Sequence, residues 1–294
     1  MLWLAIIILA YFLFAVVSLV DRYLLIGPPS SKIYTFYIGI LGILSLVLAP
    51  FVGFFVPDFC KLIFCLIVGA VYILALFALY FGLERFEASR IVPAVGGFLP
   101  IFTFFLVYFL SGFKEALSFK EFLAFTLLIL GSVIISCSSS RKISFKSLKI
   151  SAIIGLLLSL SFVLTKHVYL RLPFWTGFIW IRIGSFLTAL FFILFKTVRK
   201  EIFSGTSVFN LKTRILFLLN QGVGAGAFIL QNWAIALAGL VYLPLINALQ
   251  GVQYFFLFIL GLLFLKEGLS KKIIGQKIAA ILIIGVGLAI LAIG

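Results

Sequence analysis

The chain alternates between long apolar runs and short polar segments. Division at charged residues and at clusters of Pro and Gly leaves ten runs: 2–20, 34–56, 62–83, 91–110, 122–137, 150–170, 174–195, 215–237, 241–265 and 273–293. Most have the roughly 20 residues that a helix needs to cross a bilayer, and the fifth extends back to Phe119. None shows the long alternation of a barrel strand. The pattern therefore predicts an all-α membrane protein with ten transmembrane helices.

Composition supports a membrane protein and excludes other classes. Of the 294 residues, 65% are hydrophobic and 11% charged, against roughly 45–50% and 25% in soluble domains. The net charge of +15 does not indicate nucleic acid, because the basic residues punctuate apolar runs instead of forming a stripe. Three Cys and one His at unrelated spacings predict neither a disulfide framework nor a metal site. We expect no cofactor and no nucleic-acid partner.

The first run begins without Lys or Arg and is not followed by a small-residue cleavage pattern. It therefore predicts a retained helix and not a secretory signal. The expected location is the cell (inner) membrane, as a multi-pass protein in contact with lipid.

Two halves of the chain resemble each other. The basic segment 138–149 separates five runs in 1–137 from five in 150–294. Segment 78–95 (ALYFGLERFEASRIVPAV) corresponds to 234–251 (AIALAGLVYLPLINALQG), and each precedes a span that ends in Lys-Glu-x-Leu-Ser-x-Lys. Pro93 lies 21 residues before Lys114, and Pro244 lies 22 before Lys266. Since five is odd, the second half must enter the membrane from the opposite side, which predicts inverted repeats.

These paired segments resemble those of the EamA family of the drug/metabolite transporter superfamily, across essentially the whole length. The resemblance implies a transporter, a monomer or homodimer, with its site between the halves. The first four helices of each half would line the site, and the fifth and tenth would be peripheral. It implies no particular substrate.

Acidic side chains are absent from the middle of the predicted spans. The eight Asp and Glu all lie at span ends or in loops. The related small multidrug resistance proteins use a Glu in the first helix, where this chain has Tyr11. Proton carriage on an embedded carboxylate is therefore disfavoured.

Arg182 is the one basic residue near the centre of a run, about 12 Å in from Phe174 at 1.5 Å per residue. Its guanidinium could hold a carboxylate or phosphate through paired donors. Alternatively, it could bind backbone carbonyls or reach water along its stem. Because charge inside a membrane is usually functional, we expect Arg182 to bind substrate.

Further polar residues define candidate substrate contacts, although hydrogen bonds between helices explain many of them almost as well. The predicted substrate-binding residues besides Arg182 are Asn247, Gln250 and Gln253 in the ninth run, Gln221, Asn232 and Trp233 in the eighth, and Tyr11 and Tyr72 in the first half. For Trp233 we favour an interfacial role. Arg182, Gln250 and Gln253 are expected to face one cavity.

Several other residues have predicted structural roles. Pro93 and Pro244 are either flexible points or ordinary helix starts. Gly222 and Gly226 have the spacing that favours close helix packing. Lys166 and His167, at the end of the sixth run, are expected to be interfacial anchors.

The predicted function is a carrier that moves a small polar or anionic metabolite, with amino acids among the candidates, by alternating access. The alternatives are a flippase for lipid or lipid-linked sugar and a non-catalytic membrane assembly subunit. An enzyme is disfavoured, because the spans offer one Arg, amides and phenols and no cluster of nucleophiles, acids or metal ligands.

The first testable prediction concerns orientation. If the termini were cytoplasmic, their side would hold five Lys and Arg and the opposite side seventeen. The positive-inside rule therefore favours external termini, although the family resemblance implies cytoplasmic ones. A reporter that folds only in the periplasm should be active when fused to Gly294. A silent reporter there, beside an active one within 138–149, would show that the charge rule fails for this chain.

Overall fold

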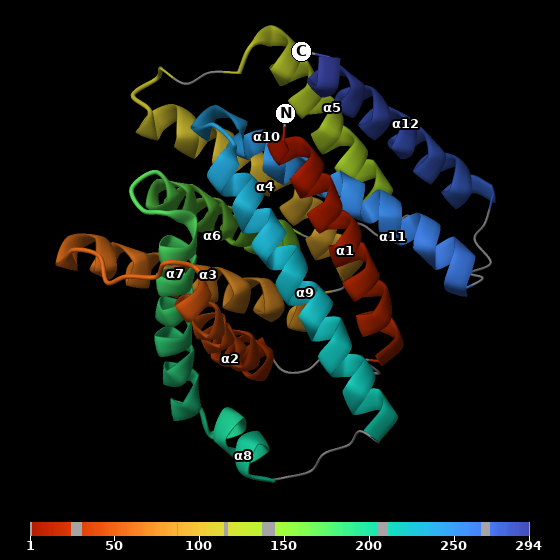
Figure 1. Cartoon of the computed structure of the whole chain (residues 1–294). Coiled ribbons are helices and arrows are strands. Elements are labelled where there is room, and N and C mark those ends of the chain that lie inside the picture. Colours follow the sequence, from red (N-terminus) through yellow and green to blue (C-terminus); the bar gives the residue numbers. More distant parts are fainter. Residues whose placement is uncertain are drawn as a thin grey trace.

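A computed structural model describes residues 2–24, 31–86, 88–114, 117–136, 145–204, 211–265 and 271–293, and within these ranges every regular element is a helix. The first half comprises α1 (Leu2–Leu24), α2 (Ser31–Leu41), the 3₁₀ helix η1 (Gly42–Phe51), α3 (Phe59–Arg85), α4 (Ala88–Leu110) and α5 (Phe119–Ser136). The second half comprises α6 (Phe145–Tyr169), α7 (Phe174–Leu190), η2 (Phe191–Leu194), α8 (Lys196–Ser204), α9 (Leu211–Leu237), η3 (Leu240–Tyr242), α10 (Leu243–Ala248), α11 (Gln250–Leu265) and α12 (Lys271–Ile293). Figure 1 shows their arrangement.

Eight helical segments of the described chain are long and apolar enough to cross a membrane. They are Leu2–Val20, Ser31–Phe51, Phe59–Arg85, Ile91–Leu110, Phe145–Tyr169, Phe174–Leu194, Leu240–Leu263 and Ile274–Ala292. This confirms a multi-pass helical membrane protein. The fifth and eighth predicted runs form helices too, α5 and α9, but are not among these eight.

Three of these spans are not continuous α-helices, which the hydrophobic pattern does not reveal, and one of them changes from α7 to η2 at Phe191. The second changes from α2 to η1 at Gly42, and its 3₁₀ stretch runs for ten residues. Such stretches rarely exceed three or four residues and often mark functional sites. The ninth span is interrupted between α10 and α11 at Leu249.

The basic segment after α7 contains the short helix α8, which we did not predict.

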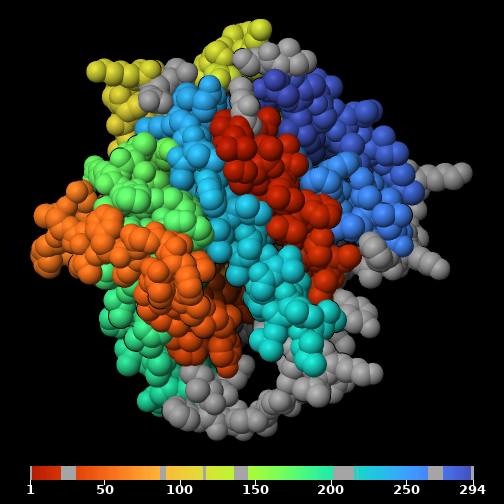
Figure 2. Space-filling model, in the orientation of Figure 1, coloured from red at the N-terminus to blue at the C-terminus, as the bar shows by residue number. Residues whose placement is uncertain are grey.

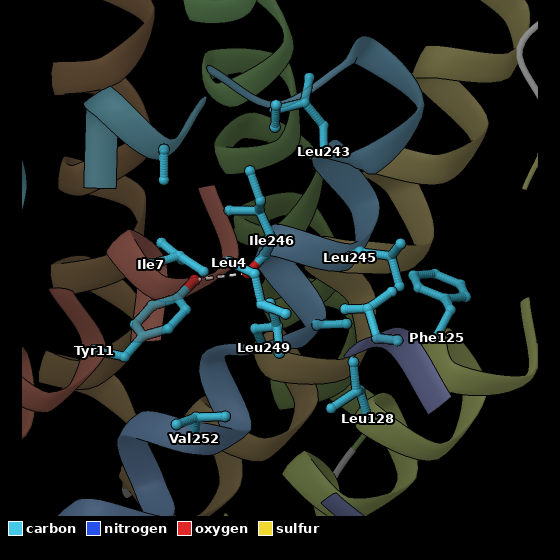
Figure 3. Packing of buried hydrophobic residues seen from close by; sticks show 14 of the residues in the cluster. Leu4, Ile7, Tyr11, Phe125, Leu128, Leu243, Leu245, Ile246, Leu249 and Val252 are labelled. Atoms are coloured by element: carbon cyan, nitrogen blue, oxygen red, sulfur yellow. Dashed lines mark hydrogen bonds between the residues drawn. The ribbon is translucent and has the colours of Figure 1, made fainter. Parts of the chain in front are cut away.

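The main apolar core surrounds α10. Leu245, Ile246 and Leu249 are fully buried there, against α1 and α5 (Figure 3). The Tyr11 hydroxyl, which is also buried, donates to the Ile246 carbonyl at 2.8 Å. Around this core α1 packs against α9 and α11, α4 against α6 and α10, and α5 against α12. This packing places α10 between the two halves of the sequence.

Helices α3 and α7 approach each other most closely at Gly69 and Gly184. A Cβ at Gly69 would lie 2.5 Å from the Ser185 backbone nitrogen, and one at Gly184 would lie 2.6 Å from the Leu66 carbonyl oxygen. Ser185 also donates to the Gly69 carbonyl at 3.3 Å. Only glycine fits at this contact, because the clashing atoms belong to backbone.

The predicted close packing at Gly222 and Gly226 was wrong. A Cβ at either position would meet nothing within 4 Å. Glycine spacing identifies a face on which a helix can pack closely, but another helix must still lie against that face. In this structure the face of α9 that carries them is uncovered, and Figure 2 shows a recess between α9 and α2.

The second prediction follows from this difference between glycines. Gly69→Ala should lower stability by about 1–3 kcal/mol, because the added methyl must displace the backbone of α7. The matched change Gly222→Ala should leave stability unchanged or slightly raised, since alanine favours helix. Thermal unfolding of the detergent-purified variants measures both. Equal melting temperatures would show that α3 and α7 are not in tight contact.

Candidate functional site

Arg182 of α7 is buried, with 8% of its surface exposed. Its Nη2 donates to the Ile38 carbonyl of α2 at 3.3 Å. Its Nη1 is buried and has no hydrogen-bond partner within the described residues. A buried N–H without an acceptor costs free energy, more so on a charged group. The guanidinium therefore has the capacity to bind one further acceptor.

Two aromatic rings from different halves of the chain lie against this guanidinium. Its Cζ is 5.5 Å from the ring centroid of Tyr72 on α3 and 5.1 Å from that of Phe228 on α9. The two rings are themselves 5.5 Å apart. Each ring face stabilises the positive charge through its quadrupole. The cation is thus kept in an apolar environment without a carboxylate.

The fourth side of the guanidinium faces Gly42, where α2 becomes η1. A Cβ at Gly42 would lie 2.7 Å from Nη2 of Arg182. The absence of a side chain at this position makes room for the arginine. We call Arg182, Tyr72, Phe228 and Gly42 the Arg182 site.

No acidic side chain that the structure describes lies near the middle of a span. Asp58 caps the start of α3, Glu84 is near the end of α3, and Glu121 is in the first turn of α5. The Lys61 ammonium, hydrogen-bonded to Asp58, holds the pKa of that exposed carboxyl below its ordinary value. These acids stabilise helix ends, and the positive charge of Arg182 has no carboxylate counter-ion among them.

The other predicted contacts divide into two groups. Tyr72 lies against Arg182 itself. Asn232 of α9 lies one turn beyond Phe228, donates to the Phe228 carbonyl at 2.9 Å and accepts from the Tyr169 hydroxyl at 2.9 Å. Asn232 thus fixes the neighbouring turn of α9 beside α6.

The remaining candidates lie elsewhere. Tyr11 and Asn247 make hydrogen bonds between helices, with Asn247 donating to Thr103 of α4 at 2.8 Å. Gln253 donates to Ser18 of α1 at 3.4 Å. The contacts of Arg182 lie with α2, α3 and α9, and they include neither Gln250 nor Gln253. The expectation that these three residues share one surface finds no support in these contacts.

Trp233 is 39% exposed and packs against Phe174 and Trp175 of α7, with ring centroids 5.5 and 6.1 Å away. Gln221 and Gln250 are half-buried. Trp233 therefore belongs to an aromatic group at one end of α7, about 12 Å along the helix from Arg182.

The two prolines differ in position. Pro244 is in the first turn of α10, where proline fits a helix start. Pro93 lies inside α4.

The sequence suggested that Lys166 is an interfacial anchor, but the structure places its side chain inside the protein. It is 3% exposed, and its Nζ donates to the Ala236 carbonyl in the last turn of α9 at 2.8 Å. The cation there stabilises the negative end of the helix dipole. His167 contacts the Val163 carbonyl through Nδ1 at 2.9 Å, one turn back in its own helix. Both residues therefore have structural contacts.

Sequence reasoning missed Phe228 and Gly42 as parts of the site. Neither residue has a signal in the sequence. Phe228 is one of many aromatic residues in the apolar runs, and the role of Gly42 depends on how α2 meets α7.

Comparison with known proteins identifies the fold alone. No family model and no curated protein matches the chain. A solved crystal structure, described only as that of a protein, superposes with a TM-score of 0.70 over 98% of this chain and 96% of its own length. The two sequences are 16% identical. The helical arrangement described here is therefore similar to that of an experimentally determined structure.

Proposed function

We propose that this protein is a secondary transporter that carries a small organic anion across a membrane by alternating access. The observation that carries the proposal is the buried Arg182, which has an unpartnered N–H and no acidic counter-ion among the described residues. Insertion of an arginine at the centre of a membrane costs roughly 2.5–3.5 kcal/mol on insertion scales, so charged residues there are usually functional. The function that this geometry favours is the binding of an anion.

Ten transmembrane helices are the topology we infer. The helices α5 and α9 coincide with predicted apolar runs and pack along spans, α5 on α12 and α9 on α1. The start of α1 and the end of α12 lie at the same end of the bundle (Figure 1). An even number of crossings accounts for this placement.

The packing of the helices supports inverted repeats. If α1 to α5 are matched in order with α6, α7, α9, the α10–α11 pair and α12, several contacts occur in equivalent pairs. The contact of α3 with α6 corresponds to that of α9 with α1, and the contact of α4 with α6 corresponds to that of α11 with α1. The contact of α5 with α12 and the contact of α4 with α10 are each their own equivalent, because the matching exchanges the two helices of each pair. A twofold relation between halves produces such pairing.

The contact of α3 with α7 has no equivalent in the other half, and this supports alternating access. Helix α3 packs closely on α7 through Gly69 and Gly184, but α9 has no comparable contact with α2. In an inverted-repeat carrier, exchange of the two contacts would open one side of the site and close the other.

These features are compatible with the EamA-like architecture that the repeated Pro and Lys-Glu segments suggest. Within it, the Arg182 site would lie between the halves, since Tyr72 belongs to the first and Arg182 and Phe228 to the second. We infer residence in the inner membrane and a monomeric or dimeric state. The substrate is a small molecule, and no cofactor is required.

The third prediction tests the role of Arg182 by counterflow in proteoliposomes. The wild type is screened first with organic acids and amino acids as candidate substrates, and with uncharged nucleosides as a comparison class. Arg182→Gln and Arg182→Lys should each reduce uptake of the transported solute about tenfold or more, because a charge-assisted hydrogen bond contributes about 1.5–3 kcal/mol and lysine lacks the planar fork.

The matched control is Arg171→Gln. Arg171 is exposed at the turn before α7, where it lies over Phe64. This variant should transport at the wild-type rate at equal protein content. Unchanged uptake by both Arg182 variants would make Arg182 a structural residue and remove the basis of the proposal.

A further inference from the structure

Ser45, three residues after Gly42 in η1, has a second buried polar group without a hydrogen-bond partner. Its Oγ is buried and makes no hydrogen bond within the described residues, as is also true of Nη1 of Arg182. Each of these atoms would gain from contact with a ligand, because burial has already removed its water.

Most hydroxyl groups in the helices that the structure describes make a hydrogen bond, and the Ser45 hydroxyl is unusual because it makes none there. Hydroxyl groups elsewhere in the helices donate to the carbonyl one turn earlier, as Thr35, Ser159 and Thr188 do at 2.7–2.9 Å. Two more buried hydroxyls, those of Ser151 and Thr176, have no partner. Ser151 lies in the second turn of α6 and Thr176 in the first turn of α7. Ser45, in contrast, lies one turn of 3₁₀ helix from Gly42, which contacts the guanidinium.

The 3₁₀ geometry of η1 places Ser45 relative to Arg182. Residues three apart eclipse in a 3₁₀ helix, so Ser45 lies on the same face as Gly42. That face of Gly42 is in contact with the guanidinium. Since three residues of 3₁₀ helix rise about 6 Å, Ser45 lies about one turn along the helix from Gly42, which contacts the guanidinium. A carboxylate that accepts one hydrogen bond of about 2.9 Å at each oxygen spans a separation of this order.

Charge restricts the ligand to a monoanion. Arg182 supplies one positive charge, and the other described buried cation, Lys166, already donates to Ala236. A phosphate dianion would leave one negative charge without a partner. An amino acid would add an ammonium group, and the three described acidic side chains all lie at helix ends. Either ligand would bury an uncompensated charge, which is costly.

We propose that the substrate is a monocarboxylate without an ammonium group, bound between Nη1 of Arg182 and Oγ of Ser45. The rings of Tyr72 and Phe228 next to the guanidinium favour an apolar body on this acid. This assignment rests on the proposed transport function and narrows its substrate from polar or anionic metabolites to one class.

The fourth prediction uses matched ligands. The panel is 3-phenylpropanoate, hexanoate and 4-methylpentanoate, each with its neutral amide and its α-amino derivative (phenylalanine, norleucine and leucine). Ligand-induced thermal stabilisation of the purified protein measures binding, and counterflow measures transport. At least one carboxylate should bind at least tenfold more tightly than both of its derivatives.

Ser45→Ala should weaken binding of that carboxylate about tenfold, by loss of one hydrogen bond to a charged group. It should not lower the melting temperature without ligand, since the hydroxyl makes no hydrogen bond within the described residues. The control is Thr126→Ala on α5, whose hydroxyl is exposed and donates to Phe122. This control should bind as the wild type does.

The outcomes separate the two proposals. Transport of amino acids or other organic acids that depends on Arg182, without binding of any carboxylate in the panel, would overturn the monocarboxylate assignment and leave the proposed transporter intact. Equal binding by an amide and its carboxylate, or by Ser45→Ala and the wild type, would also overturn the assignment. Failure to transport every solute tested would count against the transport function itself.

Discussion

The charge of Arg182 is the constraint on which the arrangement of this protein depends. A guanidinium cannot lose its proton, so it remains a cation inside an apolar bundle. The structure stabilises it with one backbone carbonyl and two aromatic rings, and no acid described in the structure serves as its counter-ion. A carboxylate there would neutralise the site and remove its attraction for an anion. The site instead keeps a positive charge and one free N–H.

The surrounding helices are shaped by this cation. Gly42 provides space for it, and the second span changes from α to 3₁₀ at that residue. The change brings Ser45 onto the face that Gly42 presents to α7. On the other side, the Gly69 and Gly184 contact holds α3 against α7, which fixes Tyr72 near the guanidinium. Arg182 therefore contacts helices from both halves of the chain, and relative movement of the halves would change its environment.

The sequence predicts the helices well and their contacts less well. Ten apolar runs correspond to helices within a few residues, because hydrophobic length is a local property. The importance of Arg182 was also visible, since an isolated charge in an apolar run is conspicuous. Three features were not visible in the sequence, because each depends on which helix lies opposite. They are the change to 3₁₀ helix at Gly42, the break at Leu249 and the uncovered face of α9 at Gly222. Lys166 was misjudged for the same reason. Its hydrogen bond is to α9, which sequence spacing does not specify.

The two halves of the chain are packed unequally. Helix α3 lies tightly against α7 through Gly69 and Gly184, whereas α9 makes no comparable contact with α2. This inequality is what a carrier caught with one side closed would have, and it is the central claim of the account.

Paired spin labels measured by electron resonance in proteoliposomes test this claim most directly. One pair is placed at Leu44 of η1 and Leu218 of α9, and the other at Ile67 of α3 and Leu187 of α7. All four side chains are exposed, with 60%, 68%, 51% and 44% of their surfaces accessible, so labelling should not disturb packing. On addition of a transported solute, a population with a shorter η1–α9 distance should appear together with a longer α3–α7 distance. Two distance distributions that stay unchanged while the solute is transported would contradict the account.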